Sequence, residues 1–262
     1  MSAPERIEVH GHRGARALLP ENTLAGYLYA IQAGADFIEL DVLATADDAL
    51  VACHDPVLRR RIYSGPFGTR VVRRMTLAQL KEWDCGARRN PLFRRQSAAP
   101  GARIPALTEV LDLASRDGFS FNIEVKTVPK RPHLTPSPAR YAELLVALVR
   151  ERGLEKRVLV QSFDFRVLAC VRALAPEIPA SALCGFRTRE FVALAAAAGV
   201  STVAPYHRAI NSRRVSDAHD AGIRVIAWTA NRPRDWERLI RAGVDGIITD
   251  DPAGLLCHLG RR

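Results

Sequence analysis

Short apolar runs alternate with longer amphipathic segments along most of this 262-residue chain. Apolar runs of about four to eight residues predict strands, whereas apolar residues spaced three and four apart predict helices. The predicted strands cover residues 7–11, 37–43, 50–53, 121–125, 158–161, 180–184, 202–204, 224–228 and 246–249. The predicted helices cover residues 22–33, 77–83, 107–116, 141–152, 190–198 and 234–242, and two more end at residues 174 and 221.

This alternation is typical of an α/β protein with a parallel sheet. About eight strands in a chain of this length favour a closed (β/α)8 TIM barrel over an open sheet. The turn Gly11-His12-Arg13-Gly14 lacks the G-x-G-x-x-G pattern of dinucleotide-binding folds. Residues 56–103 differ from the rest because they combine turns and arginine clusters with one short helix. We interpret them as an insertion after the second barrel strand, within a single domain spanning residues 1–262.

The formal net charge is +10, and only four of the 38 basic residues are lysines. Such a balance favours an anionic partner, either a phosphate compound, nucleic acid or an anionic membrane surface. The chain has no basic stripe interleaved with aromatic residues and no helix-turn-helix or zinc-finger spacing, so nucleic acid is disfavoured. The arginines of residues 56–103 form either a basic lid that attracts anionic phosphodiesters or lipid headgroups, or an ordinary solvated surface.

The pattern of cysteines and the lengths of the apolar runs bear on the cellular compartment of the protein. The five cysteines are scattered and form no C-x-x-C pair, which argues against a disulfide framework or a zinc site. The N-terminus lacks the apolar segment of a signal peptide, and no apolar run is long enough to span a bilayer. We therefore expect a cytoplasmic protein without integral membrane association, and the pattern makes no prediction of its oligomeric state.

Two carboxylates, Glu39 and Asp41, lie two residues apart in the second predicted strand. Side chains alternate along a strand, so both point to the same face. Burying two like charges together is costly unless a cation lies between them, although an edge strand with solvated charges would also fit the pair. Glu124 and Lys126 repeat the spacing with opposite charges. Together these residues predict a pocket that holds a hard metal ion beside an anion.

Polar residues recur at the carboxyl ends of the predicted strands, where parallel barrels carry their active sites. Oxygen ligands from Glu39, Asp41 and Glu124, without a thiolate, suit one divalent cation, Mg²⁺ or Ca²⁺. Further strand-end residues are His12, Arg13, His54, Lys126, Gln161 and Trp228. The two cations can neutralise phosphate oxygens, and the two histidines can exchange protons near neutral pH. This combination indicates phosphoryl transfer by in-line displacement.

At these residues the chain resembles the glycerophosphodiester phosphodiesterases. The matching motifs occur in the family's order over residues 8 to 252, and they are His12-Arg13-Gly14, Pro20-Glu21-Asn22-Thr23, Glu39-Leu40-Asp41, His54-Asp55, Glu124-Val125-Lys126, Gln161-Ser162-Phe163-Asp164 and Gly246-Ile247-Ile248-Thr249-Asp250. The resemblance implies a TIM barrel of the phospholipase C-like phosphodiesterase type. It implies metal ligation by Glu39, Asp41 and Glu124, acid–base roles for His12 and His54, and phosphate binding by Arg13 and Lys126.

The implied reaction is hydrolysis of a small-molecule glycerophosphodiester to sn-glycerol 3-phosphate and an alcohol, in family members through a cyclic phosphate. Lysophospholipase D or phosphatidylinositol-type phospholipase activity is an alternative. A non-enzymatic phosphate-binding barrel is disfavoured because every catalytic position is filled. Three residues have two interpretations each. Asn22 either caps a helix or joins the site, Asp55 either orients His54 or caps a turn, and Trp228 either lines the glycerol site or belongs to the core.

Overall fold

Eight parallel strands close into a barrel in the computed structural model, which describes residues 6–116, 118–188 and 190–261. The strands are β1 (Glu8–Gly11), β2 (Phe37–Ala44), β4 (Ser120–Val125), β5 (Val158–Ser162), β6 (Ala180–Cys184), β7 (Thr202–Pro205), β8 (Arg224–Ala227) and β9 (Gly246–Thr249). The barrel is closed because β1 pairs with both β2 and β9. A further strand, β3 (Leu50–Ala52), pairs antiparallel with β2. The predicted (β/α)8 TIM barrel is confirmed.

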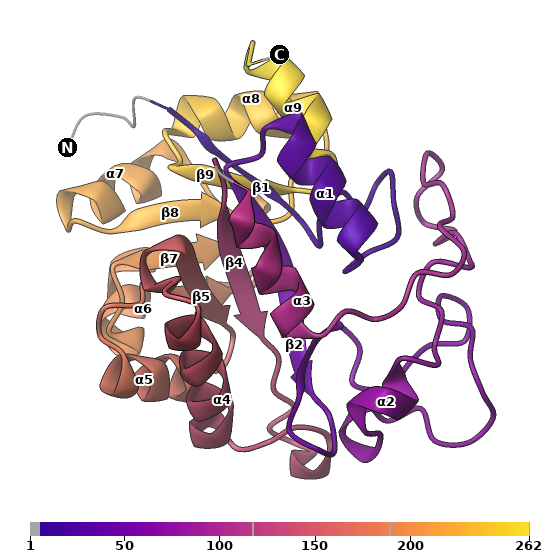
Figure 1. Cartoon of the computed structure of the whole chain (residues 1–262). Helices are drawn as coiled ribbons and strands as arrows, with labels where there is room; N and C mark the ends of the chain where they lie inside the picture. Colours follow the sequence, from indigo (N-terminus) through magenta and orange to yellow (C-terminus); the bar gives the residue numbers. More distant parts are fainter. Residues whose placement is uncertain (1–5, 117, 189, 262) are drawn as a thin grey trace.

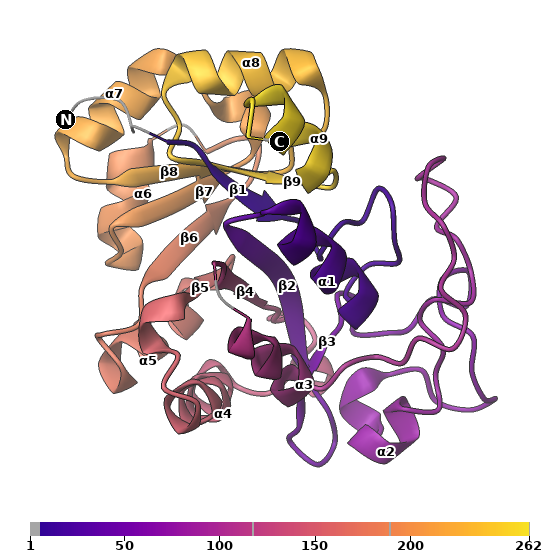
Figure 2. The same ribbon diagram turned by 45° about the horizontal axis from the view of Figure 1, so that its top comes forward.

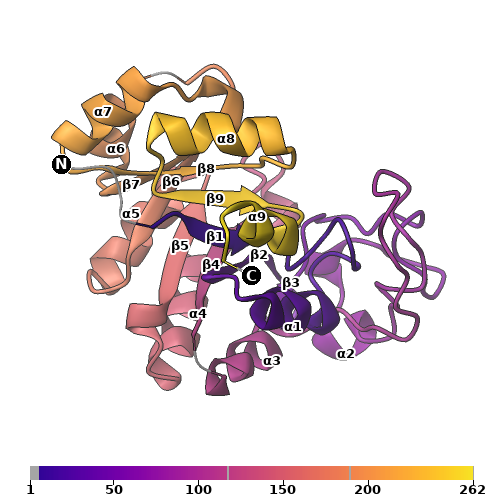
Figure 3. The ribbon, with the colours of Figure 1, turned by 90° about the horizontal axis from the view of Figure 1, so that it is seen from above.

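The helices lie outside the barrel (Figures 1 and 3). They are α1 (Leu24–Ala33), α3 (Leu107–Leu111), α4 (Pro138–Glu151), α5 (Phe165–Leu174), α6 (Phe191–Ala198), α7 (Ser212–Asp220), α8 (Pro233–Ala242) and α9 (Pro252–His258). In α4, Tyr141, Leu145 and Val149 are buried at intervals of four residues, so one stripe of the helix packs on the sheet. Among the described residues, no helix combines the length and apolar character needed to cross a bilayer.

The start of α1 and the whole of α9 differ from the sequence prediction. The N-cap of α1 is Thr23, whose side chain accepts a hydrogen bond from the Gly26 amide, so the interpretation of Asn22 as N-cap is wrong. Its C-cap, Gly34, adopts φ 91°, a left-handed conformation that glycine reaches without strain. Helix α9 was not predicted. It begins after Asp251, whose carboxylate accepts a hydrogen bond from the Gly254 amide.

Residues 53–106 leave the barrel between β3 and α3, and they lie to the right in Figures 1 and 2. They include the short helix α2 (Leu77–Leu80) and contain the predicted insertion, residues 56–103. This segment has its own apolar cluster, which packs on Leu43 and Val51 of the barrel and includes Leu58, Ile62, Tyr63, Val72, Met75, Leu80, Trp83, Cys85 and Ile104. The Trp83 ring lies so close to Gly65 that a Cβ there would be 2.4 Å from it. The segment therefore folds around Trp83.

Candidate active site

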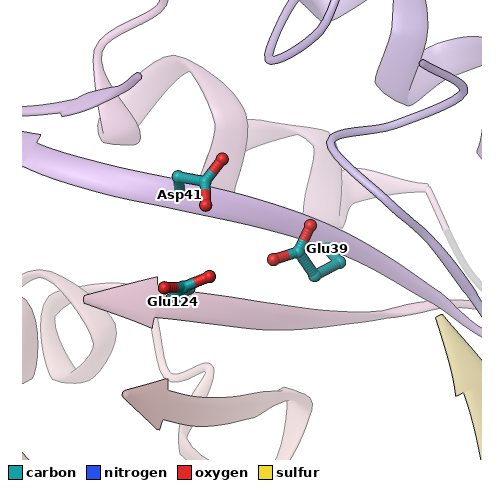
Figure 4. A group of neighbouring side chains, drawn as sticks. All are labelled: Glu39, Asp41 and Glu124. Carbon is teal, nitrogen blue, oxygen red and sulfur yellow. The ribbon is translucent and has the colours of Figure 1, made fainter. Parts of the chain in front are cut away.

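Three carboxylates meet inside the barrel because of the strand register. Asp41 on β2 is paired with Glu124 on β4, and Glu39 lies two residues earlier on the same face as Asp41. Figure 4 shows the three side chains gathered over the two adjacent strands. One oxygen from each carboxylate lies within 4.8 Å of the other two, and all three residues are buried. The structure thus brings together the three predicted metal ligands.

The two predicted phosphate cations lie among these carboxylates. Lys126 Nζ is 3.0 Å from Asp41 Oδ1 and 2.6 Å from Glu124 Oε1. Arg13 Nε is 2.9 Å from Asp41 Oδ2, and its Nη1 donates to Glu21 Oε1 at 2.8 Å. A buried carboxylate next to two cations is stabilised in its charged form. The site therefore holds its cations in fixed positions before any substrate binds.

The three carboxylates titrate differently because they differ in how strongly cations oppose the effect of burial. Burial raises the pKa of Asp41, but the charges of Arg13 and Lys126 outweigh this effect and hold the pKa well below its usual value. Burial and the negative charges of Asp41 and Glu124 raise the pKa of Glu39 well above its usual value. Burial also raises the pKa of Glu124, against the opposing charge of Lys126. Glu39 is consequently the carboxylate that most needs another cation.

A carboxylate from the last strand end orients His12. Asp250 Oδ1 lies 2.6 Å from His12 Nδ1, and Asn231 fixes Asp250 by donating to Oδ2 at 2.6 Å and accepting from the Asp250 amide at 2.8 Å. When His12 Nδ1–H donates its hydrogen bond to Asp250, the lone pair of Nε2 is available for other partners. Burial lowers the pKa of His12, and the charge of Asp250 only partly offsets this. His12 is therefore suited to accept a proton at neutral pH.

His54 has its own carboxylate partner. Its Nδ1 lies 2.9 Å from Asp55 Oδ1, and Asp55 also forms an ion pair of 2.9 Å with Arg59. Of the two interpretations of Asp55, the structure supports the one in which it orients His54. Both histidines line the cavity, but the His54 side chain is 31% exposed and the His12 side chain only 12%, so His54 is in closer contact with solvent.

The loop between β1 and α1 is held in an unusual backbone conformation. Arg13 has φ 50° and Asn22 has φ 55°, a region that non-glycine residues rarely adopt. The Arg13 amide donates to Glu39 Oε2 at 2.9 Å, and Asn22 Nδ2 donates to Asp41 Oδ2 at 2.9 Å. Asn22 Oδ1 in turn accepts from the buried Tyr27 hydroxyl. This loop therefore positions the carboxylates, and Asn22 belongs to the site.

A cavity of about 350 Å³ opens above these groups. Besides the predicted residues, its lining includes Arg16, Phe163, Leu183 and Ile248. Trp228 also lines it, and the Trp228 indole donates to the Ala204 carbonyl, which fixes the ring. Four aromatic rings lie in a row, with neighbouring centroids 5.4 to 5.9 Å apart, in the order Phe163, Trp228, Tyr206, Phe186. One side of the cavity is thus apolar and the other is charged.

Sequence reasoning missed several residues that support the site. Arg16 lines the cavity and forms an ion pair with Glu21, which also binds Arg13. Glu21 and Asp250 belong to motifs that carry the resemblance, but their spacing alone predicts no role, and none of those motifs includes Asn231. Only the three-dimensional pairing of Asn231, Asp250 and His12 makes these roles visible.

The donor set fits a divalent cation. Three carboxylates without a thiolate are the ligands that Mg²⁺ and Ca²⁺ prefer. Gln161 Oε1 is buried, and within the described residues it accepts no hydrogen bond. Glu39 and Glu124 line the cavity, Asp41 and Glu21 are buried beside it, and these four carboxylates are matched by three cations, Arg13, Arg16 and Lys126. An additional positive charge would balance this group.

Comparisons with known proteins agree with the fold and the motifs. The model of the glycerophosphoryl diester phosphodiesterase family matches residues 12–254. A glycerophosphodiester phosphodiesterase of Caldanaerobacter subterraneus subsp. tengcongensis is 35% identical over 251 residues, covering 95% of this chain and 96% of that protein. A proposed glycerophosphoryl diester phosphodiesterase of Silicibacter pomeroyi has a similar structure, with a TM-score of 0.90, 31% identity and coverage of 99% and 94%.

A phosphodiesterase of Oleispira antarctica, solved with its product sn-glycerol 3-phosphate, has the same fold at 24% identity, with a TM-score of 0.81 and coverage of 97% and 96%. Fold and relatives together define a TIM-barrel enzyme that cleaves phosphoric diesters. Within that class, the chain belongs to the glycerophosphoryl diester phosphodiesterase family.

Proposed function

We propose that this chain hydrolyses glycerophosphodiesters to sn-glycerol 3-phosphate and an alcohol, with one divalent cation, Mg²⁺ or Ca²⁺, held by Glu39, Asp41 and Glu124. The observation that carries the proposal is the cluster of three buried carboxylates, two of which line the same cavity as His12. The product bound to the Oleispira antarctica phosphodiesterase supports the identity of the phosphorylated product.

Charge explains why the cation is needed. Glu39 and Glu124 line the cavity and would repel an anionic phosphodiester unless a cation lay between them and the phosphate. When bound, the divalent ion would supply positive charge to the phosphate oxygens as negative charge develops on them. Arg13 and Lys126 add to that positive charge, and Arg16 at the cavity wall extends it. Because the pKa of Glu39 is raised, cation binding should also release a proton from the site.

The two histidines divide the proton transfers. His12 Nε2 accepts the proton of the attacking hydroxyl, whose oxygen forms the new bond to phosphorus, and Asp250 stabilises the resulting imidazolium. His54 donates a proton to the oxygen of the departing alcohol as its bond to phosphorus breaks. His54 stays oriented by Asp55 throughout. In the hydrolysis as a whole, water is consumed and both histidines return to their initial protonation states.

The aromatic row gives a specific reason to keep lysophospholipase D activity as a second candidate. Phe163 and Phe186 are 50% and 59% exposed, although large apolar side chains are usually buried. Together with Trp228 and Tyr206 they would form an apolar wall against which an acyl chain or an apolar alcohol group could lie. A substrate with a longer apolar group would bury more of this wall.

Two parallel assays distinguish the candidates. A colour reaction coupled to the release of glycerol 3-phosphate, run over a panel of headgroups, detects the first; release of the free alcohol from a lysophospholipid, which leaves lysophosphatidic acid, detects the second. Each sample is measured with and without excess chelator. We expect turnover of a deacylated glycerophosphodiester that chelation abolishes and added Mg²⁺ or Ca²⁺ restores. Full activity in excess chelator would contradict the metal-dependent proposal, and turnover of the lysophospholipid alone would favour the second candidate.

A further inference from the structure

The entire net charge of the chain resides in the insertion. Residues 56–103 contain twelve lysines and arginines but only two carboxylates, Glu82 and Asp84, which gives a local charge of +10. The chain as a whole has 38 basic and 28 acidic residues, so the remainder holds twenty-six of each and is neutral. A uniform preference for arginine would spread the excess over the whole surface. Its concentration in one segment indicates a surface with a function of its own.

Most of this charge is directed to solvent. The carboxylate partners of the insertion lie outside it and engage only Arg59, Arg73, Lys81 and Arg95. Within the described part of the chain, several exposed arginines have no carboxylate within ion-pair distance, among them Arg61, Arg70, Arg74, Arg88, Arg89 and Arg94. Unpaired exposed guanidinium groups can bind external anions without first breaking an internal ion pair.

Two apolar side chains protrude among these arginines. Phe67 is 97% exposed and Leu92 is 70% exposed, the highest values for large apolar side chains in the described residues. Arg60 links their loops, since it donates to the Gly65 and Pro66 carbonyls beside Phe67 and its own carbonyl accepts from Arg88 at 2.5 Å. These hydrogen bonds tie the loop that carries Phe67 to the segment that leads to Leu92, and both apolar tips protrude from the same insertion.

We propose that this surface, formed by Arg61, Phe67, Arg88, Leu92 and Arg94 and called here the basic tip surface, docks on an anionic lipid bilayer. Clustered arginines are attracted to anionic headgroups, and exposed apolar tips insert at the boundary between headgroups and acyl chains. Nucleic acid fits the surface less well. Phe67 is the one aromatic ring of the surface, Leu92 offers no stacking face, and the four-residue helix α2, the one α-helix of this segment, is too short to enter a groove.

The basic tip surface lies next to the catalytic cavity. The Phe93 ring, adjacent to Leu92, lies 4.7 Å below the guanidinium of Arg16, which lines the cavity. Gln96 Nε2 donates to the carbonyls of Arg16 and Leu19, which fastens the insertion to the loop after β1. Docking would therefore place the cavity beside the bilayer. The proposal concerns binding and holds whichever phosphodiester the site hydrolyses.

Flotation of the full-length protein with lipid vesicles tests the proposal. The vesicles contain phosphatidylcholine alone or with about 30% phosphatidylglycerol, a composition that supplies a negative surface potential. We expect binding to the anionic vesicles only. Replacing three arginines of the surface by glutamine should weaken the affinity on the order of 100-fold, about fivefold for each arginine. The matched control removes the same charge from the opposite side of the barrel, in α7 and α8, at Arg213, Arg234 and Arg241.

A second variant separates lipid binding from general binding to polyanions. Phe67→Ser with Leu92→Ser leaves the charge unchanged, and both side chains are exposed, so the fold should tolerate the change. We expect about a tenfold loss of vesicle affinity from the lost apolar contact, with weak binding to duplex DNA unaltered. The proposal is wrong if anionic vesicles do not bind. It is also wrong if DNA binds as tightly as vesicles and the serine variant weakens neither.

Discussion

Charged side chains are buried and paired at the barrel mouth, the end of the barrel that carries the carboxylate cluster, but exposed and mostly unpaired in the insertion. At the mouth, Glu39, Asp41 and Glu124 are buried, and each cation lies within about 3 Å of a carboxylate. In the insertion, most arginines are exposed and few have a carboxylate partner. Burial makes each charge at the mouth depend on its neighbours, because an unpaired buried charge is costly. Solvent screens the charges of the insertion from one another, so these arginines can be replaced singly with little effect on folding.

The largest effect is expected at the mouth, from His12→Ala. Removing the proton acceptor should lower kcat by about two to four orders of magnitude, the usual scale for acid–base groups. Steady-state kinetics on a glycerophosphodiester measure this change. His133→Ala removes an exposed histidine and should leave kcat unaltered. An equal fall in both variants, or in neither, would show that His12 has no special role.

Next in size is the loss of the core of the insertion in Trp83→Ala. Deleting a buried tryptophan side chain costs about 3–5 kcal/mol in the free energy of unfolding. We expect amide hydrogen exchange to rise within residues 53–106, while the barrel strands keep their protection. Trp236→Ala is the counterpart in the barrel, since Trp236 is buried on α8. If Trp83→Ala also raised amide exchange in the barrel strands, the insertion and the barrel would unfold as one cooperative unit, and the proposed difference between them would be wrong.

A smaller effect is expected from Asp250→Asn, which keeps the size of the side chain but removes its charge. By analogy with the carboxylates that orient metal-bound histidines, the loss of the Asp250 charge should lower activity by about 10- to 100-fold. Burial lowers the pKa of His12 and the charge of Asp250 raises it, so removing that charge should lower the pKa further. The acidic limb of the pH–rate profile should therefore move to lower pH. An unshifted limb would mean that another group sets it.

The smallest effect concerns Asp84, one of the two carboxylates of the insertion. It accepts hydrogen bonds from the amides of Gly86, Ala87 and Gly101, and these lower its pKa below 3.8 against the opposing effect of burial. A carboxylate with a lowered pKa stabilises the fold above its unfolded pKa, and the stabilisation is lost as the pH falls. Asp84→Asn should therefore cost about 1 kcal/mol at neutral pH and little in acid. Chemical denaturation with Glu82→Gln as control measures this, and a cost independent of pH would contradict it.

The fold and the three predicted ligands followed from the sequence because both depend on local alternation. Apolar runs and amphipathic helices predict a parallel barrel, and a spacing of two places Glu39 and Asp41 on one face. The supporting residues could not be predicted in this way. The spacing of Asn231 from Asp250 carries no signal, and Asn22 resembles a helix cap until its backbone is seen to place its amide on Asp41. The arrangement of the arginines in the insertion also depends on irregular loops, for which no periodicity exists.

The barrel closes where its first strand meets its last, and the pair of His12 and Asp250, separated by 238 positions in the sequence, spans that junction. A chain emerging from the ribosome therefore exposes the carboxylate cluster long before it can assemble the histidine and its partner. If His12 acts as proposed, catalytic competence arises only after β9 has been made and docks beside β1. Hydrolytic activity consequently serves as a direct reporter that the whole barrel has been made and closed.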